Sequence, residues 1–209
     1  MHIDSTKLCG RFVYLKELQE QHVPVLKQLA RDARLWEFTK SLVVNETFDA
    51  QFERYVGVAL SSQGEGIFGV GLQKTFVIFR SSDDAVIGMT RYYGLDEKHK
   101  RVDIGYTWYI PDVWGKVYNK ECKLLLLQYA FEVLNFNRVG FHVAHVNTRS
   151  QRAVEKIGAV KEGVLRKHSY QADGSTRHTV LYSIISDEWP EKKEILIQMI
   201  VSSDTSHGR

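Results

Sequence analysis

The chain lacks several features that define specialised classes of protein. It has no run of about 18 apolar residues, so we expect no membrane-spanning helix. Residues Met1 to Ser5 do not have the basic and then apolar layout of a secretory signal peptide. The chain has only two cysteines, Cys9 and Cys122, and their spacing fits no metal site. We therefore expect a protein of the cytoplasm, a reducing compartment, that holds no metal.

A large excess of charge of one sign is also absent. The 28 Lys and Arg residues are mixed along the chain with 25 Asp and Glu residues, and the net charge is +3. This balance argues against a nucleic acid as partner, and no membrane partner is expected. Hydrophobic residues make up 44% of the chain, enough for a real core. The length of 209 residues predicts a single domain over residues 1–201, with a disordered tail over 202–209.

Hydrophobic periodicity predicts a mixed α/β fold. Alternation typical of strands is found at residues 11–15, 75–80, 86–93, 102–110, 139–146, 160–170 and 177–185. Helical spacing is found at residues 22–32, 48–60, 118–133, 147–157 and 189–201. The order predicts an antiparallel start, a helix-linked middle and a closing hairpin that turns at Asp173-Gly174.

The strand over residues 102–110 separates by parity into two faces. One face carries Val102, Ile104, Tyr106, Trp108 and Ile110, and the other carries Asp103, Gly105, Thr107 and Tyr109. A small, polar face with a carboxylate suggests the wall of a cleft, and the alternative is an outer face in contact with solvent. Gly105 within a strand suggests close approach by another group, such as a ligand.

The turn from Pro111 to Glu121 links this strand to the helix that follows. A Gly-containing turn at a helix N-terminus presents free N–H groups to an anion, and Lys116 and Lys120 add positive charge. A plain strand-to-helix turn is the alternative reading. Asn147 is most simply the N-cap of a later helix.

A second glycine-rich segment, Gly64-Glu65-Gly66-Ile67-Phe68-Gly69, matches the pattern G-x-G-x-x-G. A dinucleotide site needs that pattern between a strand and a helix. Here it follows a helical pattern and precedes a strand, so we interpret it as a connection.

Five segments follow one another in a recognisable order: Leu8-x-Gly10-Arg11-x-Val13-x-Leu15, Val102 to Trp108, Trp114 to Glu121, Asn147-x-x-Ser150-x-x-Ala153-x-Glu155-Lys156-x-Gly158-Ala159, and Glu162 to Arg166. Through these motifs the sequence from about Leu8 to Pro190 resembles the GNAT superfamily, especially the ribosomal-protein N-terminal acetyltransferases. The resemblance implies a mixed, mostly antiparallel sheet of about seven strands. It also implies helices on both faces and a splayed, V-shaped acyl-CoA cleft. Two departures stand in the pyrophosphate loop: Asp112 replaces Gln or Arg, and Val117 replaces the second Gly.

The resemblance further implies acetyl-CoA as cosubstrate and direct transfer of the acetyl group to a primary amine. The residues it assigns to the cofactor are Trp108, Tyr109, Ile110, Trp114, Gly115, Lys116, Val117, Tyr118, Asn119, Lys120, Asn147, Ser150 and Lys156. Asp103 is the candidate base, directly or through water, if burial raises its pKa. Ser150 or Asn147 is a candidate donor to the leaving sulfur.

The acceptor is expected between the first two helices and the last hairpin. Trp36, Phe38, Tyr92, Tyr93 and residues 167–177 are its candidate neighbours. This mixed set fits a peptide N-terminus and a small amine about equally, and the protein is expected as a monomer or homodimer. The alternative function is a catalytically weak or inactive module that binds CoA or a partner.

Overall fold

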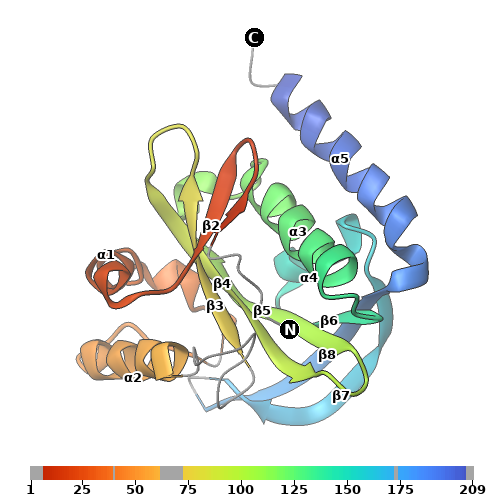
Figure 1. Ribbon diagram of the computed structural model, residues 1–209. Coiled ribbons are helices and arrows are strands. Elements are labelled where there is room, and N and C mark those ends of the chain that lie inside the picture. The colour runs from red at the N-terminus through yellow and green to blue at the C-terminus, as the bar shows by residue number, and fades with distance from the viewer. Residues whose placement is uncertain (1–6, 40, 62–72, 172–173, 206–209) are drawn as a thin grey trace.

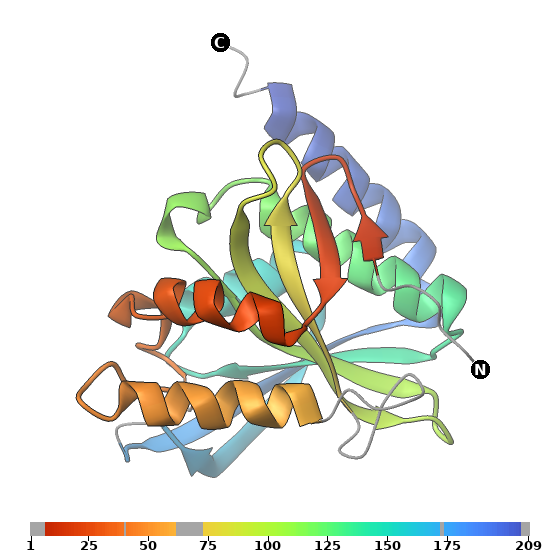
Figure 2. The same ribbon diagram turned by 60° about the vertical axis from the view of Figure 1, so that its left-hand side comes forward.

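The computed structural model describes residues 7–39, 41–61, 73–171 and 174–205. An open sheet of eight strands, in the order β1-β2-β3-β4-β5-β6-β8-β7, runs through this part of the chain. Helices α1 (Val23–Leu29) and α2 (Phe48–Ser61) cover one face. Helices α3 (Tyr118–Gln128), α4 (Thr148–Lys156) and α5 (Trp189–Thr205) lie on the other (Figures 1 and 2). The predicted mixed α/β architecture is confirmed.

The strands pair antiparallel at every junction except one. Their bounds are β1 Lys7–Cys9, β2 Val13–Glu17, β3 Lys74–Arg80, β4 Val86–Asp96, β5 Arg101–Tyr109, β6 Arg138–Ala144, β7 Val160–Tyr170 and β8 Thr176–Ile185. The short edge strand β1, which pairs with β2, has no clear alternation and was not predicted. It makes the sheet one strand larger than the seven expected.

The exception, β5 with β6, opens the sheet. These parallel strands pair only at their beginnings, from Arg101 with Arg138 to Asp103 with Gly140. Beyond that point β6 continues to pair with β8 as far as Ala144, while β5 stays with β4. The sheet therefore splits into two arms, as the predicted V-shaped cleft requires.

A β-bulge in β5 changes which residues share a face. Met89 pairs with Trp108 and Arg91 pairs with Gly105, so β5 has one extra residue between these pairs. Tyr106 lies within the bulge at a φ of +51°. The parity predicted for residues 102–110 is therefore wrong beyond Gly105, because the extra residue reverses the alternation. Trp108 packs with α1 and α2, and Tyr109 packs on the opposite face with Val102 and Ile104.

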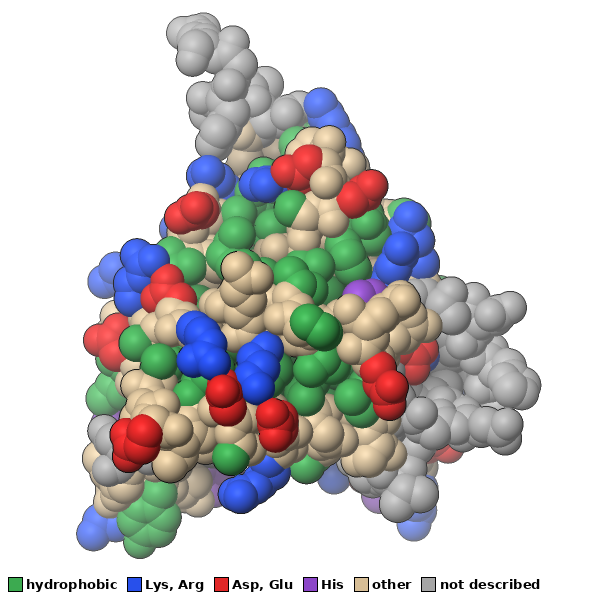
Figure 3. Space-filling model, turned by 90° about the vertical axis from the view of Figure 1, so that its left-hand side faces the viewer, with side chains coloured by type: hydrophobic (Ala, Val, Ile, Leu, Met, Phe, Trp, Pro, Cys, Tyr) green, Lys and Arg blue, Asp and Glu red, His purple; other side chains and the backbone are tan. Residues whose placement is uncertain are grey.

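Two apolar cores lie on the two faces of the sheet. In β3, Phe76 and Ile78 face α3 and α5, while Val77 and Phe79 face α1 and α2. The stripe predicted on α2 is buried at Phe48, Phe52 and Val56, whereas basic and acidic side chains lie side by side on the outer surface of this half of the molecule (Figure 3). Exposed pairs such as Arg31 with Asp49, 2.6 Å apart, add little stability. The apolar stripes therefore hold these helices to the sheet.

Helix α5 is longer than predicted. It continues to Thr205, so residues 202–205 of the expected tail belong to the helix, and residues 206–209 lie outside the described chain. The segment Gly64 to Gly69 also lies outside the described residues. Among the described helices, none combines the length and hydrophobicity needed to cross a membrane.

Candidate active site

A cavity of about 590 Å³ lies at the split between the two arms of the sheet. Its walls come from β5, the turn before α3, α4, and the ends of β6 and β8. Of the residues predicted to bind the cofactor, those that line it are Trp108, Tyr109, Trp114, Gly115, Lys116, Asn119, Lys120, Asn147, Ser150 and Lys156. Ile110, Val117 and Tyr118 are not among the lining residues. Val117 is buried, and Ile110 and Tyr118 pack against the core.

The turn before α3 has the geometry of an anion site. Gly115 has a φ of +76°, which a residue with a Cβ adopts only with strain. Val117 is the N-cap of α3 and makes no side-chain cap. The first-turn N–H groups of Tyr118, Asn119 and Lys120 therefore have no acceptor from the cap or from the helix itself. These are the donors that a diphosphate needs.

The substitution of Val117 for glycine carries no backbone penalty. Its φ is −66° and its ψ is −27°, ordinary helical values for any residue. The side chain is buried at the base of the turn. Val117, which replaces the second Gly of the family pattern, is therefore compatible with a normal helix start.

Helix α4 forms the other wall, and its N-terminus is already capped. The Asn147 Oδ1 atom accepts a hydrogen bond from the Ser150 backbone N–H at 2.9 Å. This confirms the simple reading of Asn147 as a cap. The α4 residues Arg149, Arg152 and Lys156 still line the cavity with their positive charge.

One stacked pair connects the two walls. The Arg149 guanidinium lies 3.8 Å from the centre of the Trp114 ring. The Trp114 Nε1–H in turn donates to the Tyr109 carbonyl at 2.7 Å.

Lys120, expected to contact a diphosphate, donates from Nζ to the Ser203 hydroxyl of α5 at 2.7 Å.

Asp103 lies at the closed end of the split and is not a lining residue. Burial raises the pKa of Asp103 above its ordinary value, against the attraction of His142 and of the Arg138 and Arg101 guanidiniums. Its Oδ2 atom is 3.6 Å from Nε2 of His142, and His142 does line the cavity. The carboxylate fits against Gly140, where a Cβ would lie 2.1 Å from Oδ1. The sequence pointed to the carboxylate and missed the imidazole in front of it.

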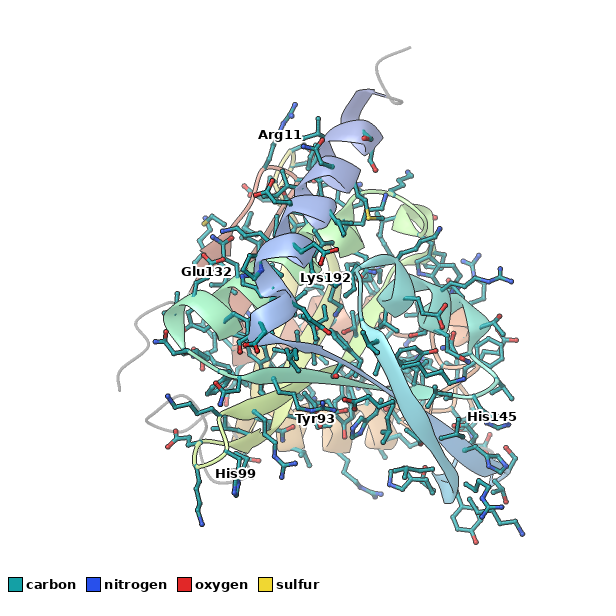
Figure 4. The ribbon with its side chains drawn as sticks, turned by 90° about the vertical axis from the view of Figure 1, so that its right-hand side faces the viewer. Arg11, Tyr93, His99, Glu132, His145 and Lys192 are labelled. Carbon is teal, nitrogen blue, oxygen red and sulfur yellow. The ribbon has the colours of Figure 1, made fainter. Side chains whose placement is uncertain are left out.

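Gly105 also has a structural explanation. A Cβ at this position would lie 2.7 Å from the ring of Tyr93, so the glycine makes room for that side chain. Tyr93 lies in the middle of the molecule (Figure 4) and lines the cavity. The close approach predicted at Gly105 is therefore made by a neighbouring side chain.

Of the residues expected around the acceptor, Trp36, Phe38 and Tyr93 line the cavity, as do His168 and Arg177 from residues 167–177. Tyr92 does not, because it is buried in the core on the opposite face, where its hydroxyl donates to the Leu126 carbonyl. Adjacent residues of a strand point to opposite faces, so only one of the two tyrosines reaches the cleft.

Lys123 is a lining residue that the sequence analysis did not assign. It is buried, and burial lowers its pKa. Its Nζ donates to the Thr107 hydroxyl at 3.1 Å, and Thr107 is 2.8 Å from the Thr90 hydroxyl. The signal was its position four residues after Asn119, on the same face of the helix.

Glu121, also missed, holds the N-terminus of α3 against the turn between β1 and β2. Its carboxylate accepts the backbone N–H groups of Arg11, Phe12 and Val13 at 2.9, 2.6 and 2.7 Å. Gly10 leaves the space for it, since a Cβ there would lie 2.5 Å from the carboxyl carbon. Among the described residues, no group of His, Cys, Asp and Glu is placed to bind a metal ion.

Comparison with known proteins agrees with this geometry. Residues 13–160 match the family described as acetyltransferase (GNAT) domain. Two relatives from Bacillus subtilis (strain 168) are the "Uncharacterized N-acetyltransferase YoaA" and the "Putative ribosomal N-acetyltransferase YdaF". YoaA is 36% identical over 108 residues, and YdaF is 34% identical over 112 residues. These alignments cover 52% and 53% of this chain, and 60% of each relative's length.

A solved structure extends the likeness over nearly the whole chain. It is described as a putative acetyltransferase from T. thermophilus, and it is 32% identical with a TM-score of 0.81. The match covers 96% of this chain and all of that one. These findings confirm the resemblance drawn from the motifs: the chain belongs to the GNAT acetyltransferase family.

Proposed function

We propose that this protein transfers the acetyl group of acetyl-CoA to a primary amine by direct attack of the amine on the thioester. The observation that carries the proposal is the cavity at the split of the sheet. One end has the free N–H groups of α3 and the cations of α4, which suit the diphosphate of CoA. The other end has aromatic side chains and His142, which suit an acceptor amine.

In the proposed reaction the amine nitrogen bonds to the thioester carbonyl carbon, and the carbon–sulfur bond then breaks to release the thiolate. His142 takes the proton from the amine, and the Asp103 carboxylate behind it stabilises the imidazolium. Asp103 thereby acts as a positioning residue. Ser150, and Lys123 through its ammonium, are the lining donors available to the leaving sulfur. The cleft walls hold the amine and the thioester next to each other, which lowers the entropic part of the barrier to reaction.

Turnover by single and double variants tests this assignment. We expect His142→Gln to lower turnover by about a hundredfold, with affinity for acetyl-CoA unchanged. Asp103→Asn should lower turnover by a smaller factor. The double variant should turn over no more slowly than His142→Gln alone. Additive losses would show that the two residues act separately.

The second candidate function is a module that binds CoA without turnover. The observation that favours it is the lack of a carboxylate among the described residues that line the cavity. Binding of acetyl-CoA without release of CoA thiol, across peptide and small-amine acceptors, would support it.

The free thiols of Cys9 and Cys122 fit the proposed cytoplasmic setting.

A further inference from the structure

The charge of the cavity is of one sign. None of the described residues that line it is Asp or Glu. Seven are Lys or Arg, namely Lys116, Lys120, Lys123, Arg149, Arg152, Lys156 and Arg177. Six of these belong to α3, α4 or the turn before α3, where the CoA diphosphate, its adenosine phosphate and, at Lys123, the leaving sulfur would account for them. Arg177 is different, because it comes from β8, on the other arm.

Arg177 is buried without a charged partner among the described residues. Only 8% of it is exposed, and burial lowers its pKa. Its Nε is 3.4 Å from the Thr179 hydroxyl and its Nη2 is 3.5 Å from the His142 carbonyl, the outer limit of hydrogen bonding. A guanidinium has five N–H donors, so most of its capacity remains unused. Burying such a group is costly unless a ligand supplies acceptors for its remaining N–H donors.

A second guanidinium, on β4 of the opposite arm, adds to the positive potential of the same cavity. Arg91 is 3% exposed, and it lies 4.5 Å from the ring centre of Tyr106 and 5.3 Å from that of Tyr55. Its Nη1 donates to Gln73 at 2.8 Å, while Nε and Nη2 have no hydrogen-bond partner among the described residues. Tyr55 and Tyr106 line the cavity, so this charge lies directly behind its surface.

We propose that the acceptor carries a carboxylate close to its primary amine, and that Arg177 binds this carboxylate. The inference rests on the proposed acetyl transfer and adds the chemical class of its acceptor. Arg177 adjoins the His142 carbonyl, so a carboxylate held there places a neighbouring amine beside the imidazole. Arg is suited to carboxylates because its planar fork donates two parallel hydrogen bonds. A polyamine would meet the two buried cations Arg177 and Arg91, and no described lining residue would offer it a carboxylate.

Matched acceptors test the proposal and separate its two sources, a free amino acid and an acidic peptide N-terminus. Initial rates of CoA release are measured with glutamate against glutamine amide, with peptides beginning Ser-Glu, Ser-Gln or Ser-Lys, and with spermidine. We expect the carboxylate member of at least one series to have a KM at least tenfold below its neutral analogue. Equal or better turnover of spermidine, or of the neutral analogues, would overturn the proposal.

Variants of Arg177 show whether this residue is responsible. Arg177→Gln should raise the KM for the carboxylate acceptor by ten- to a hundredfold. The KM for the neutral analogue should stay within about twofold of its wild-type value. Arg177→Lys should recover part of the loss. Arg152→Gln, in the wall assigned to CoA, is the matched control and should raise the KM for acetyl-CoA without changing the preference between acceptors. An unchanged preference in folded Arg177→Gln would refute the role of this residue.

The carboxylate site can be tested even if the protein acetylates none of these acceptors. If no acceptor is acetylated, calorimetry of the same carboxylate compounds with the acetyl-CoA complex measures the subsite by itself. Binding to the wild type that Arg177→Gln loses would keep the carboxylate site and reject the transfer reaction. No binding in either protein would reject the site.

Discussion

The interaction between His142 and Asp103 can be measured without knowing the acceptor. The attraction of His142 opposes the rise in the pKa of Asp103 that burial causes, so His142→Gln should raise that pKa further. At the 3.6 Å between Nε2 and Oδ2, two unit charges attract by about 1 kcal/mol in water and about 5 kcal/mol at a dielectric constant near 20. The side chains are 36% and 23% exposed, which places the pair towards the lower value.

We therefore expect His142→Gln to remove about 1–2 kcal/mol of electrostatic attraction, which raises the pKa of Asp103 above its value in the wild type. Carboxyl-carbon NMR of the wild type and of His142→Gln, titrated from pH 3 to pH 8, measures it. Arg101→Gln is the matched control, because Arg101 is a weaker influence and is mostly exposed. An unchanged Asp103 titration in His142→Gln would show that the two side chains do not interact. Asp103 could then not act on the reaction by stabilising the imidazolium of His142.

Three further predictions concern the helix that follows β5. Gly115→Ala should lower stability by about 1 kcal/mol because of its φ of +76°, which lowers Tm by about 2–4 °C; an unchanged Tm would contradict the left-handed turn. Lys123→Met should raise Tm at pH 7, and this gain should shrink as pH approaches 10. The sign follows from the lowered pKa of Lys123: the buried ammonium destabilises the native state until the proton is lost as pH rises through the folded pKa. A gain independent of pH would refute that reason. Glu121→Ala should cost roughly 3 kcal/mol, measured by urea denaturation, because it removes the acceptor of three backbone N–H groups; a cost below about 1 kcal/mol would contradict this.

Much of the fold was predictable because its signals are local. The stripe on α2, the Asn147 cap and the hairpin between β3 and β4 each depend on residues close in sequence. The position of the bulge at Tyr106 could not be predicted, since nothing in the alternation of residues 102–110 marks the extra residue. It is the register with β4 that places Trp108 and Tyr109 on their faces.

The site was predictable where it depends on a turn and a helix start, and less so where it depends on contacts between distant strands. The sequence placed Gly115 and Lys116 in a turn before a helix, and both line the cavity. The pairing of Asp103 with Gly140 brings His142 next to the carboxylate, and this parallel contact joins segments almost forty residues apart. Arg177 reaches the cavity from a third segment.

The most direct test of the central claim combines wild-type protein, acetyl-CoA and a mixed set of peptide and small primary amines. Thiol release is followed, and the acceptors and the protein are weighed by mass spectrometry. Direct transfer predicts one acetylated acceptor for each CoA released, with no acetylated intermediate on the protein. Tight binding of acetyl-CoA with no acetylated acceptor and no thiol release would contradict the claim, and would leave a CoA-binding module in its place.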